Sequence, residues 1–385
     1  MKPISYGRQF ISDEDINAVI QVLKSDFLTQ GPTIQHFEKE FAKYVDAKYA
    51  VAVANGTAAL HLSAMALNVQ PGDKWLTTPI TFVASANCIR YCGGEIDFID
   101  IDSKTYCIDI VKLEEKLKSV PKGTYKGIIP VDFAGYPVNM EEIRSLANDY
   151  DLKIIEDACH APGGFFVDNQ GTNQKCGNGQ FADLAIFSFH PVKHIATGEG
   201  GMITTNNKEL YEKLCLYRTH GITRNEDQMS ENHGGWYYQM IELGYNYRLS
   251  DIQAALGISQ LSRADIGLNA RQEIAQRYNQ AFTKNDHIQT PFVANEANHA
   301  YHLYIIQIDD RKGLYEYLRK HNIFSQVHYV PVHTMPYYKN QENTKHDLPI
   351  AETYYDHCLS LPMYPTLTIN EQNYVIDKVL DFVNS

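Results

Sequence analysis

The feature that most constrains the fold is an alternation of short apolar segments and amphipathic helical patterns along the first half of the chain. Such an alternation predicts parallel strand pairing with helices on both faces of a sheet, the α/β class. In open sheets of this class, ligands bind at the carboxyl ends of the strands. The expected strands are at 49–53, 74–78, 96–100, 126–131, 153–155, 182–189 and 201–205, and the expected helices are at 58–67, 82–91, 110–117 and 140–150.

The pattern changes after residue 246. Helical periods at 250–261, 266–282, 312–321 and 370–382 there surround alternating strand patterns at 301–308 and 324–329. The 385 residues are enough for about two domains. We therefore predict a large domain at 1–245, which begins with a helical arm (12–23 and 34–44), and a smaller α+β domain at 246–385. The segment 168–180, rich in glycine and asparagine, is expected to be a surface loop.

Charge and cysteine usage exclude several classes of protein. The chain has 34 basic and 46 acidic residues, a net charge of −12, which opposes binding to a nucleic-acid backbone. It contains no apolar run of about 18 residues, and its first residues carry no export signal, so no membrane segment is expected. Its seven cysteines form no CxxC pair, which favours reduced thiols and a cytoplasmic protein. The histidines of the second half lack accompanying acidic or cysteine ligands, so we expect no metal site.

Lys193 is the first candidate for catalysis. It lies in the segment SFHPVKHIATGEGG, which starts at Ser188, where an apolar strand runs into a proline-bent loop. Partial burial beside His190 and His194 would lower the pKa of a lysine and yield a nucleophilic amine. Such an amine forms a Schiff base with an aldehyde, as pyridoxal 5′-phosphate (PLP) requires.

Other segments supply what a PLP site needs. Asp157 follows an expected strand and could keep the pyridine nitrogen protonated. The small-residue turn at Gly56 and Thr57, which opens a helix, suits a phosphate, and Ser188 could add a hydroxyl. Phe82, after another strand, could lie over the ring. Taken alone, an Asp of this kind can also cap a helix and a Phe can belong to the core.

Together these segments resemble a known family. The motifs are GTAAL at Gly56, TPITF ending at Phe82, EDACH at Glu156, SFHPVKHIATGEGG at Ser188 and GYNYRLSDIQAALG at Gly244. In this order, and with LTQGP at Leu28, they resemble the fold-type I PLP-dependent nucleotide-sugar aminotransferases, the DegT/DnrJ/EryC1/StrS group. The resemblance implies a large domain with a mostly parallel, seven-stranded type of sheet, a small C-terminal domain and a homodimer with shared active sites.

The resemblance also implies roles for individual residues. Lys193 would bind PLP covalently and move the proton, and Asp157 would pair with the pyridine nitrogen. His160 would lie near the ring hydroxyl. Gly56, Thr57 and Ser188 would hold the phosphate, with Phe82 at the ring. Asn246 would reach the phosphate of the partner subunit's cofactor.

Within the family, the pattern is most similar to enzymes of the pseudaminic acid pathway. The resemblance then implies transfer of the amino group of L-glutamate to C4 of a UDP-linked 4-keto-6-deoxy-N-acetylhexosamine, with ping-pong kinetics. The implied substrate contacts are Tyr6, Asp26, Phe27, Leu28, Thr29, Gln326, Val327, His328 and Tyr329. His194 has no implied role.

Other functions stay open at this point. A C3 or C4 aminotransferase for another UDP- or dTDP-linked keto sugar would carry the same cofactor motifs. A PLP-dependent lyase or desulfurase would need a loop cysteine near the lysine, and none is evident. A non-catalytic PLP-binding regulator would need a basic DNA-binding appendage, and no such segment is visible.

Overall fold

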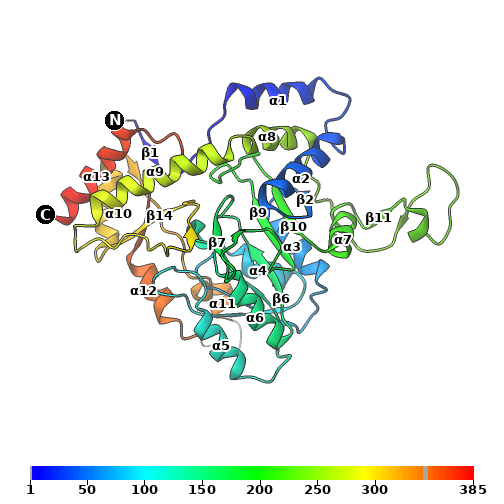
Figure 1. Ribbon diagram of the computed structural model, residues 1–385, viewed down its shortest axis with the longest axis horizontal. Helices are drawn as coiled ribbons and strands as arrows, with labels where there is room; N and C mark the ends of the chain where they lie inside the picture. The colour runs from blue at the N-terminus through cyan, green and yellow to red at the C-terminus, as the bar shows by residue number, and fades with distance from the viewer. Residues whose placement is uncertain (1, 341–345) are drawn as a thin grey trace.

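A seven-stranded sheet forms the centre of the computed structural model, which describes residues 2–340 and 346–385 (Figure 1). All neighbouring strands are parallel except β10, which is antiparallel to both of its neighbours. The mostly parallel α/β sheet predicted from the sequence is thus confirmed. Its order is β2 (Tyr49–Val53), β10 (Gly201–Thr205), β9 (Leu184–Ser188), β6 (Lys153–Asp157), β5 (Tyr125–Ile129), β3 (Lys74–Thr77) and β4 (Glu95–Phe98).

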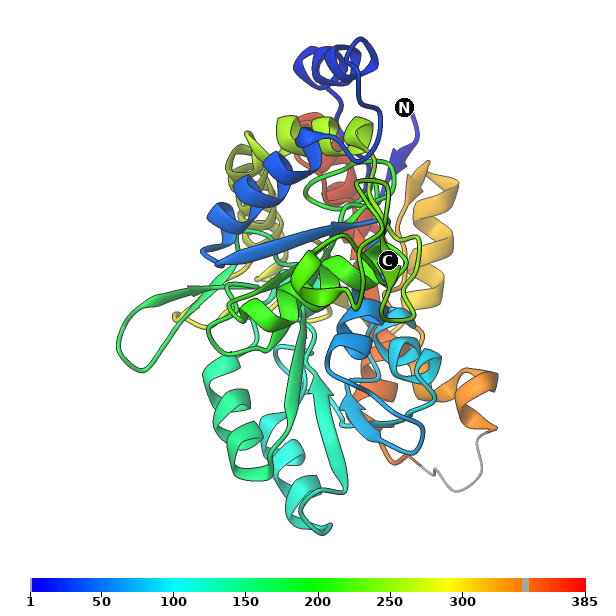
Figure 2. The ribbon, with the colours of Figure 1, turned by 90° about the vertical axis from the view of Figure 1, so that its right-hand side faces the viewer.

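Helices cover both faces of this sheet. In Figure 2, α3 (Gly56–Ala66) and α4 (Ala84–Tyr91) lie on one side of the strands, and α5 (Ile110–Lys118) and α6 (Met140–Tyr150) lie on the other. Several helices start at an asparagine or aspartate whose side chain accepts a backbone N–H of the first turn, which satisfies a donor that has no partner inside the helix. These N-cap residues are Asn55, Asp109, Asn139 and, for α7 (Lys208–Arg218), Asn207.

A second apolar cluster lies in the C-terminal part of the chain. Its two-stranded sheet pairs β14 (Tyr304–Gln307) with β16 (Cys358–Leu361). The N-terminal strand β1 (Ile4–Ser5) joins this part by pairing with β15 (Ile323–Phe324), so both ends of the chain pack here (Figure 1). The division at residue 245 stays a prediction. The helices that pack around this cluster are α9 (Ala264–Phe282), α10 (Arg311–Lys320) and α13 (Ile369–Val383), whereas α11 (Pro336–Lys339) and α12 (Pro349–His357) place their buried residues in the core of the central sheet.

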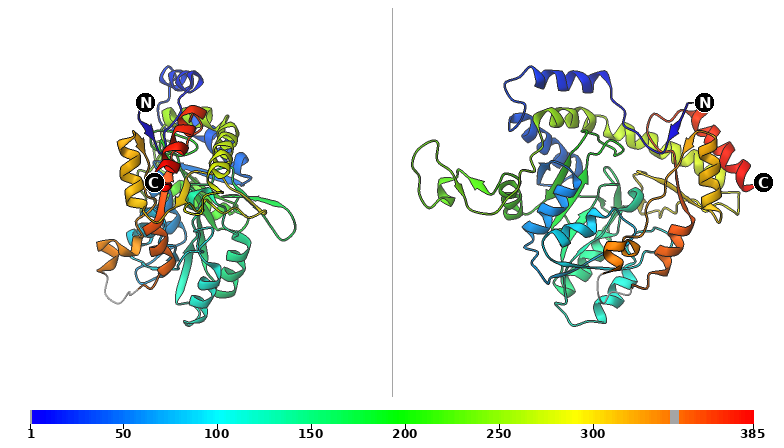
Figure 3. Two further views of the ribbon diagram at one scale, coloured as in Figure 1. Left: turned by 90° about the vertical axis from the view of Figure 1, so that its left-hand side faces the viewer. Right: turned by 180° about the vertical axis from the view of Figure 1, so that it is seen from behind.

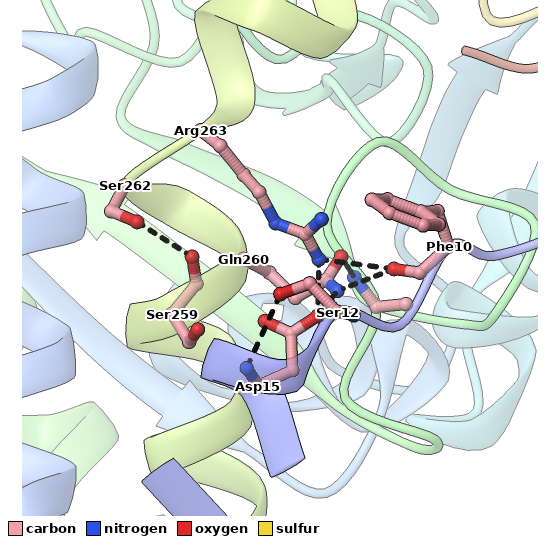
Figure 4. A network of polar contacts seen from close by, with 8 residues as sticks. Phe10, Ser12, Asp15, Ser259, Gln260, Ser262 and Arg263 are labelled. Atoms are coloured by element: carbon pink, nitrogen blue, oxygen red, sulfur yellow. Dashed lines mark hydrogen bonds and ion pairs between the residues drawn. The ribbon is translucent and has the colours of Figure 1, made fainter. Parts of the chain in front are cut away.

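The N-terminal helical arm is tied to the body by a buried carboxylate. Helix α1 (Asp13–Leu23) lies along α8 (Asp251–Leu261), and α2 (Pro32–Val45) follows. Asp15 on α1 is fully buried and accepts hydrogen bonds from Gln260 Nε2 at 2.7 Å and from Arg263 Nη2 (Figure 4). Both donors also bind the carbonyl of Phe10. The network fixes the path of residues 10–15 across α8.

A second arm, residues 219–249, extends away from the body in its middle part, while Tyr245, Tyr247 and Leu249 at its end pack against the body. It contains the antiparallel pair β11 (Ile222–Thr223) and β12 (Gln239–Met240), and Figures 1 and 3 show it projecting beyond α7. Large apolar side chains on it are exposed, among them Trp236 (75%) and Leu243 (71%). An apolar surface of this kind indicates a binding partner.

Two local expectations from the sequence are wrong. Segment 168–180 contains β8 (Asn173–Lys175), which pairs with β7 (Phe165–Val167), and β7 also pairs with β13 (Ala297–Asn298), so part of the expected loop is a sheet. The strand expected at 324–329 ends at Phe324; beyond it Gln326 forms only an isolated bridge with Ser360, and His328 and Tyr329 line the cavity described below. Within the described residues, no helix is long and apolar enough to span a membrane.

Candidate active site

A cavity of about 440 Å³ opens at the carboxyl ends of four strands of the central sheet. Its walls come from the segments that follow β2 (Asn55–Thr57), β3 (Thr81–Ser85), β6 (Asp157–His160) and β9 (Ser188–Lys193). This is the position at which open α/β sheets bind ligands, because the loops after parallel strands meet at one edge. Residues Tyr6, His328 and Tyr329 close the cavity from the other part of the chain.

Lys193 lines this cavity. A backbone hydrogen bond of 2.8 Å from its N–H to the carbonyl of His190 closes the turn that presents it. Burial lowers the pKa of Lys193, while the nearby Cys159 and Asp157 act to raise it. A lysine with a lowered pKa is neutral in a larger fraction of molecules than a solvated lysine, and an amine nucleophile must be neutral.

Asp157, at the end of β6, faces the same cavity. Its Oδ2 accepts a hydrogen bond of 2.7 Å from the hydroxyl of Ser85, which in turn lies 2.9 Å from the hydroxyl of Thr81. Its Oδ1 accepts the backbone N–H of Cys159 at 3.2 Å. The carboxylate is therefore held in one orientation by donors from two different strand ends.

The turn after β2 forms an anion cradle. The side chain of Asn55 accepts the N–H of Ala58 at 2.8 Å, which leaves the N–H groups of Gly56 and Thr57 free at the start of α3. A Cβ atom on Gly56 would lie 3.0 Å from the Cβ of Ser188, so a larger residue would push these two segments apart by a few tenths of an ångström. Free N–H groups, a helix N-terminus and a hydroxyl together suit a phosphate.

His160 lines the cavity beside Lys193 and is held as a neutral ring. Its Nδ1 accepts the N–H of Ala134 at 3.2 Å, so Nε2 carries the hydrogen and lies 3.3 Å from the hydroxyl of Tyr329. The rings of His160 and Tyr329 stack at 27°, and His302 lies 4.3 Å from His160 between centroids. Burial, reinforced by Lys193, lowers the pKa of His160 well below its ordinary value.

The structure brings together ten of the residues singled out from the sequence and leaves seven apart. Asn246 is exposed at the base of the projecting arm, and Gln326 turns its side chain to the N–H of Val327. Segment 26–29 is exposed beside α8, where Thr29 pairs with Ser250. The ten that line the cavity are Tyr6, Gly56, Thr57, Phe82, Asp157, His160, Ser188, Lys193, His328 and Tyr329. The seven outside it are Asp26, Phe27, Leu28, Thr29, Asn246, Gln326 and Val327.

Several residues of the cavity were missed by sequence reasoning. Ser85 and Thr81 flank Phe82 on the segment after β3, so polar side chains near that phenylalanine were the available signal. His302 had no such signal, because it reaches the cavity from a part of the chain far away in sequence.

A buried acidic group lies behind Asp157. This group consists of Asp132, Glu156 and Cys176, and one polar atom from each lies within 4.8 Å of the others. None of the three was expected from the sequence to have a role in a site. Burial raises the pKa of Asp132 to about 7 and that of Glu156 well above its ordinary value. We infer that the two carboxyl groups share a proton near neutral pH, which limits the negative charge beside Asp157.

The cavity offers the groups that PLP requires. Lys193 supplies an amine for the aldehyde, Asp157 a fixed carboxylate for the ring nitrogen, and the turn at Gly56 with Ser188 a cradle for the phosphate. Phe82 lines the same cavity with 58% of its surface exposed, so a face of its ring is free to contact a planar ligand. The donor set therefore fits the cofactor.

Comparisons with known proteins agree with this reading. The model of the DegT/DnrJ/EryC1/StrS aminotransferase family matches residues 9–380. The spore coat polysaccharide biosynthesis protein SpsC of Bacillus subtilis is 39% identical over 388 residues, covering 99% of this chain and 97% of that protein. The UDP-4-amino-4,6-dideoxy-N-acetyl-beta-L-altrosamine transaminase of Campylobacter jejuni is 38% identical over 386 residues, with the same coverage of both chains.

Solved structures are similar over the whole chain. The aminotransferase PseC of Helicobacter pylori, involved in the biosynthesis of pseudoaminic acid, superposes with a TM-score of 0.87 at 31% identity and covers 99% of both chains. The Streptococcus pneumoniae protein Spr1654, solved in a PLP-form, gives a TM-score of 0.86 at 27% identity and covers 97% of both chains.

Proposed function

Since the chain belongs to the DegT/DnrJ/EryC1/StrS aminotransferase family, whose members use PLP, we propose that it moves the amino group of L-glutamate to C4 of a UDP-linked 4-keto-6-deoxy-N-acetylhexosamine. The observation that carries the proposal is that Lys193 and Asp157, from the ends of neighbouring strands β9 and β6, face one cavity. Similarity to the altrosamine transaminase supports the choice of sugar and of C4.

Each residue of the site has a separate role in the proposed reaction. PLP supplies an electron sink that makes the Cα–H of the amino donor acidic. Lys193 would accept that proton and return it to the carbon that was the aldehyde of the cofactor, on the far side of the amino nitrogen, for which Lys193 must be a neutral amine. Asp157 holds a positive charge at the ring nitrogen, and Ser85 fixes the orientation of its carboxylate. Lys193 then performs the same transfer in reverse for the keto sugar, which predicts ping-pong kinetics.

The substrate is tested by a panel of keto sugars. Purified protein with PLP and L-glutamate is offered UDP- and dTDP-linked 4-keto and 3-keto sugars, and each product is identified by NMR. We expect turnover of the UDP-linked 4-keto-6-deoxy-N-acetylhexosamine, with a new amine at C4. Exclusive turnover of dTDP-linked 3-keto sugars would contradict the proposed substrate, and the protein would still be an aminotransferase.

The role of Lys193 is tested by the visible absorbance of the holoenzyme. Lys193→Ala is expected to abolish the PLP absorbance band that L-glutamate bleaches, together with turnover. Lys175→Ala is the matched control, because Lys175 binds Asp46 and the carbonyl of Tyr44 outside the cavity. Glutamate-dependent bleaching that persists in Lys193→Ala would contradict the assignment.

A different keto sugar is the second candidate function. The chain is 39% identical to a protein of spore coat polysaccharide biosynthesis, slightly more than to the altrosamine transaminase. Six of the nine substrate contacts predicted from the sequence lie outside the cavity of a single chain, so the cavity alone does not support one sugar over another. The same substrate panel decides between the two.

We further propose a homodimer with shared active sites. Asn246 is exposed at the base of the 219–249 arm, and segment 26–29 lies near it because Thr29 pairs with Ser250. The arm carries Trp236 and Leu243 into solvent, which a second copy of the chain would cover. In this arrangement Asn246 completes the site of the partner. An enzyme with this substrate and seven free cysteines belongs in the cytoplasm.

Mixed dimers test the shared site. If Lys193 and Asn246 of one site come from different subunits, mixing Lys193→Ala with Asn246→Ala subunits restores one intact site per mixed dimer. Activity should then appear that neither variant has alone. Analytical ultracentrifugation of the unmixed proteins must show dimers. No recovery of activity in verified mixed dimers would contradict shared sites.

A further inference from the structure

Arg271 is a buried positive charge without a counter-ion. It lies on α9 with 2% of its surface exposed, and its Nη1 donates to the carbonyls of Met363 at 3.0 Å, Tyr301 at 3.2 Å and His302 at 3.3 Å. Its Nε has no hydrogen-bond partner. Over residues 2–340 and 346–385, no carboxylate lies within 4.0 Å of its guanidinium. A buried charge left unpaired is costly, so its presence calls for an explanation.

Arg271 shares a second cavity with the catalytic lysine. This rear cavity, also about 440 Å³, lies between the segment Arg8–Glu14, α9 and Pro365, and both Lys193 and Arg271 line it. Lys193 therefore stands between the active-site cavity and the rear cavity. The two other arginines of the rear cavity differ from Arg271: Arg263 is paired with Asp15, and Arg8 is exposed. Glu14, a carboxylate that also lines the cavity, is exposed, so among the arginines and carboxylates of this cavity that the structure describes, only Arg271 carries a charge that is both unpaired and shielded from water.

We propose that Arg271 is a positioning residue for amino transfer, whose unpaired charge keeps the amino group of Lys193 neutral when it must accept a proton. The proposal rests on the proposed function, in which Lys193 acts as the base. A buried guanidinium disfavours the protonation of an amine nearby, because two positive charges repel each other strongly where water does not screen them. Arg271 suits this task because a guanidinium stays charged throughout the working pH range.

The other charged and titratable groups around Lys193 do not replace Arg271. Burial is the largest cause of the lowered pKa of Lys193. Cys159 and Asp157 act to raise this pKa, and Arg271 acts to lower it further. The surrounding histidines are neutral, because burial lowers the pKa of each far below its ordinary value. They are His160, His194, His302 and His328.

A purely structural role is the alternative, since Arg271 also joins three carbonyls from two separate segments. Two substitutions separate the roles. Arg271→Gln removes the charge and keeps an amide donor for the carbonyls, whereas Arg271→Met removes the charge and every hydrogen bond. The measurement is the pH midpoint of the glutamate half-reaction, followed on the holoenzyme by bleaching of the visible PLP absorbance.

We expect Arg271→Gln and Arg271→Met to raise this midpoint equally, by about one pH unit. Arg8→Gln, which removes an exposed guanidinium from the same cavity, should leave it unchanged. A midpoint unaltered in Arg271→Gln, or raised only in Arg271→Met, overturns the proposal. These outcomes differ from failure of the proposed function, in which wild-type protein shows no glutamate-dependent bleaching.

A second variant tests the charge without touching Arg271. Thr366 lines the rear cavity, three residues after Met363. Thr366→Glu adds a carboxylate to its wall and leaves the bonds from Arg271 to the carbonyls in place. The midpoint should rise in Thr366→Glu and stay constant in Thr366→Gln. Equal midpoints in the two variants overturn the proposal even if Arg271→Gln does not fold.

Discussion

The hydroxyl of Ser85 donates a 2.7 Å hydrogen bond to Oδ2 of Asp157 across the carboxyl edge of the central sheet. Ser85 is on α4, after β3, and Asp157 ends β6, so 72 positions separate them in the chain. The bond is buried, which makes it sensitive to loss of either partner. It fixes the carboxylate that, in the proposed function, would face the ring nitrogen of the cofactor.

Removal of this hydroxyl should weaken the cofactor site. Ser85→Ala leaves Oδ2 of Asp157 without its side-chain donor, a loss of about 1.5–3 kcal/mol for a bond to a charged group. We expect PLP to bind at least about tenfold more weakly, as measured by titration of the apoprotein followed through visible absorbance. Ser63→Ala is the control, because Ser63 is equally buried but donates only to the carbonyl of Ala59 in its own helix. Equal PLP affinities of the two variants would contradict this role.

The anchor of the N-terminal arm should contribute to stability. Arg263→Met leaves the buried carboxylate of Asp15 without its cationic partner, which is expected to cost about 3 kcal/mol of unfolding free energy. The measurement is the midpoint of urea unfolding of the holoenzyme. Arg319→Met, on the exposed side of α10, removes only stacking on Tyr315 and Phe324 and should cost less than about 1 kcal/mol. Similar midpoints for both variants would show that the network is dispensable.

Acid should destabilise the protein through His299. Burial lowers its pKa from an ordinary 6.5 to about 3, and its Nδ1 accepts the N–H of Tyr301 at 2.8 Å. Between these two pH values the unfolded chain binds a proton that the folded protein does not. The free energy of unfolding therefore falls as pH is lowered, by about 1.4 kcal/mol per pH unit for this group.

His299→Gln should flatten that dependence between pH 6.5 and pH 3, as measured by urea unfolding at a series of pH values. The matched control is His287→Gln, which replaces an exposed histidine. Equal slopes in the two variants would show that His299 does not carry the effect.

The direction of the 219–249 arm should depend on one glycine. Gly221 has φ +69°, and a Cβ atom there would lie 1.8 Å from the carbonyl oxygen of Glu242, so an alanine forces the two strands of the arm apart. If the arm covers a partner subunit, Gly221→Ala should raise the dissociation constant of the dimer about tenfold or more. A loss of about 1.4 kcal/mol of association free energy is sufficient for a tenfold change. Sedimentation at a series of concentrations measures this. Gly235→Ala, at a position with open space, is the control, and an equally stable dimer in both variants would argue against the arm as the contact.

The local pattern of the sequence determined the sheet and the cofactor chemistry. Strand-length apolar segments separated by helical periods allow few arrangements, and all seven expected strands are present in the sheet. Lys193, Asp157 and Gly56 each follow a strand, and parallel strands bring their carboxyl ends to one edge, so their meeting in one cavity followed from position in the chain. These are short-range patterns repeated along the chain.

Only the tertiary structure decided the contacts between distant segments. Ser85 and Asp157 meet because β3, β5 and β6 are neighbours, and Arg271 reaches the vicinity of Lys193 because α9 packs across the rear of the sheet loops. Nothing in the residues beside Arg271 indicates that it is buried without a counter-ion. Burial and pairing depend on which segments fold against one another, so a charge that is unremarkable in the sequence can become important in the folded protein.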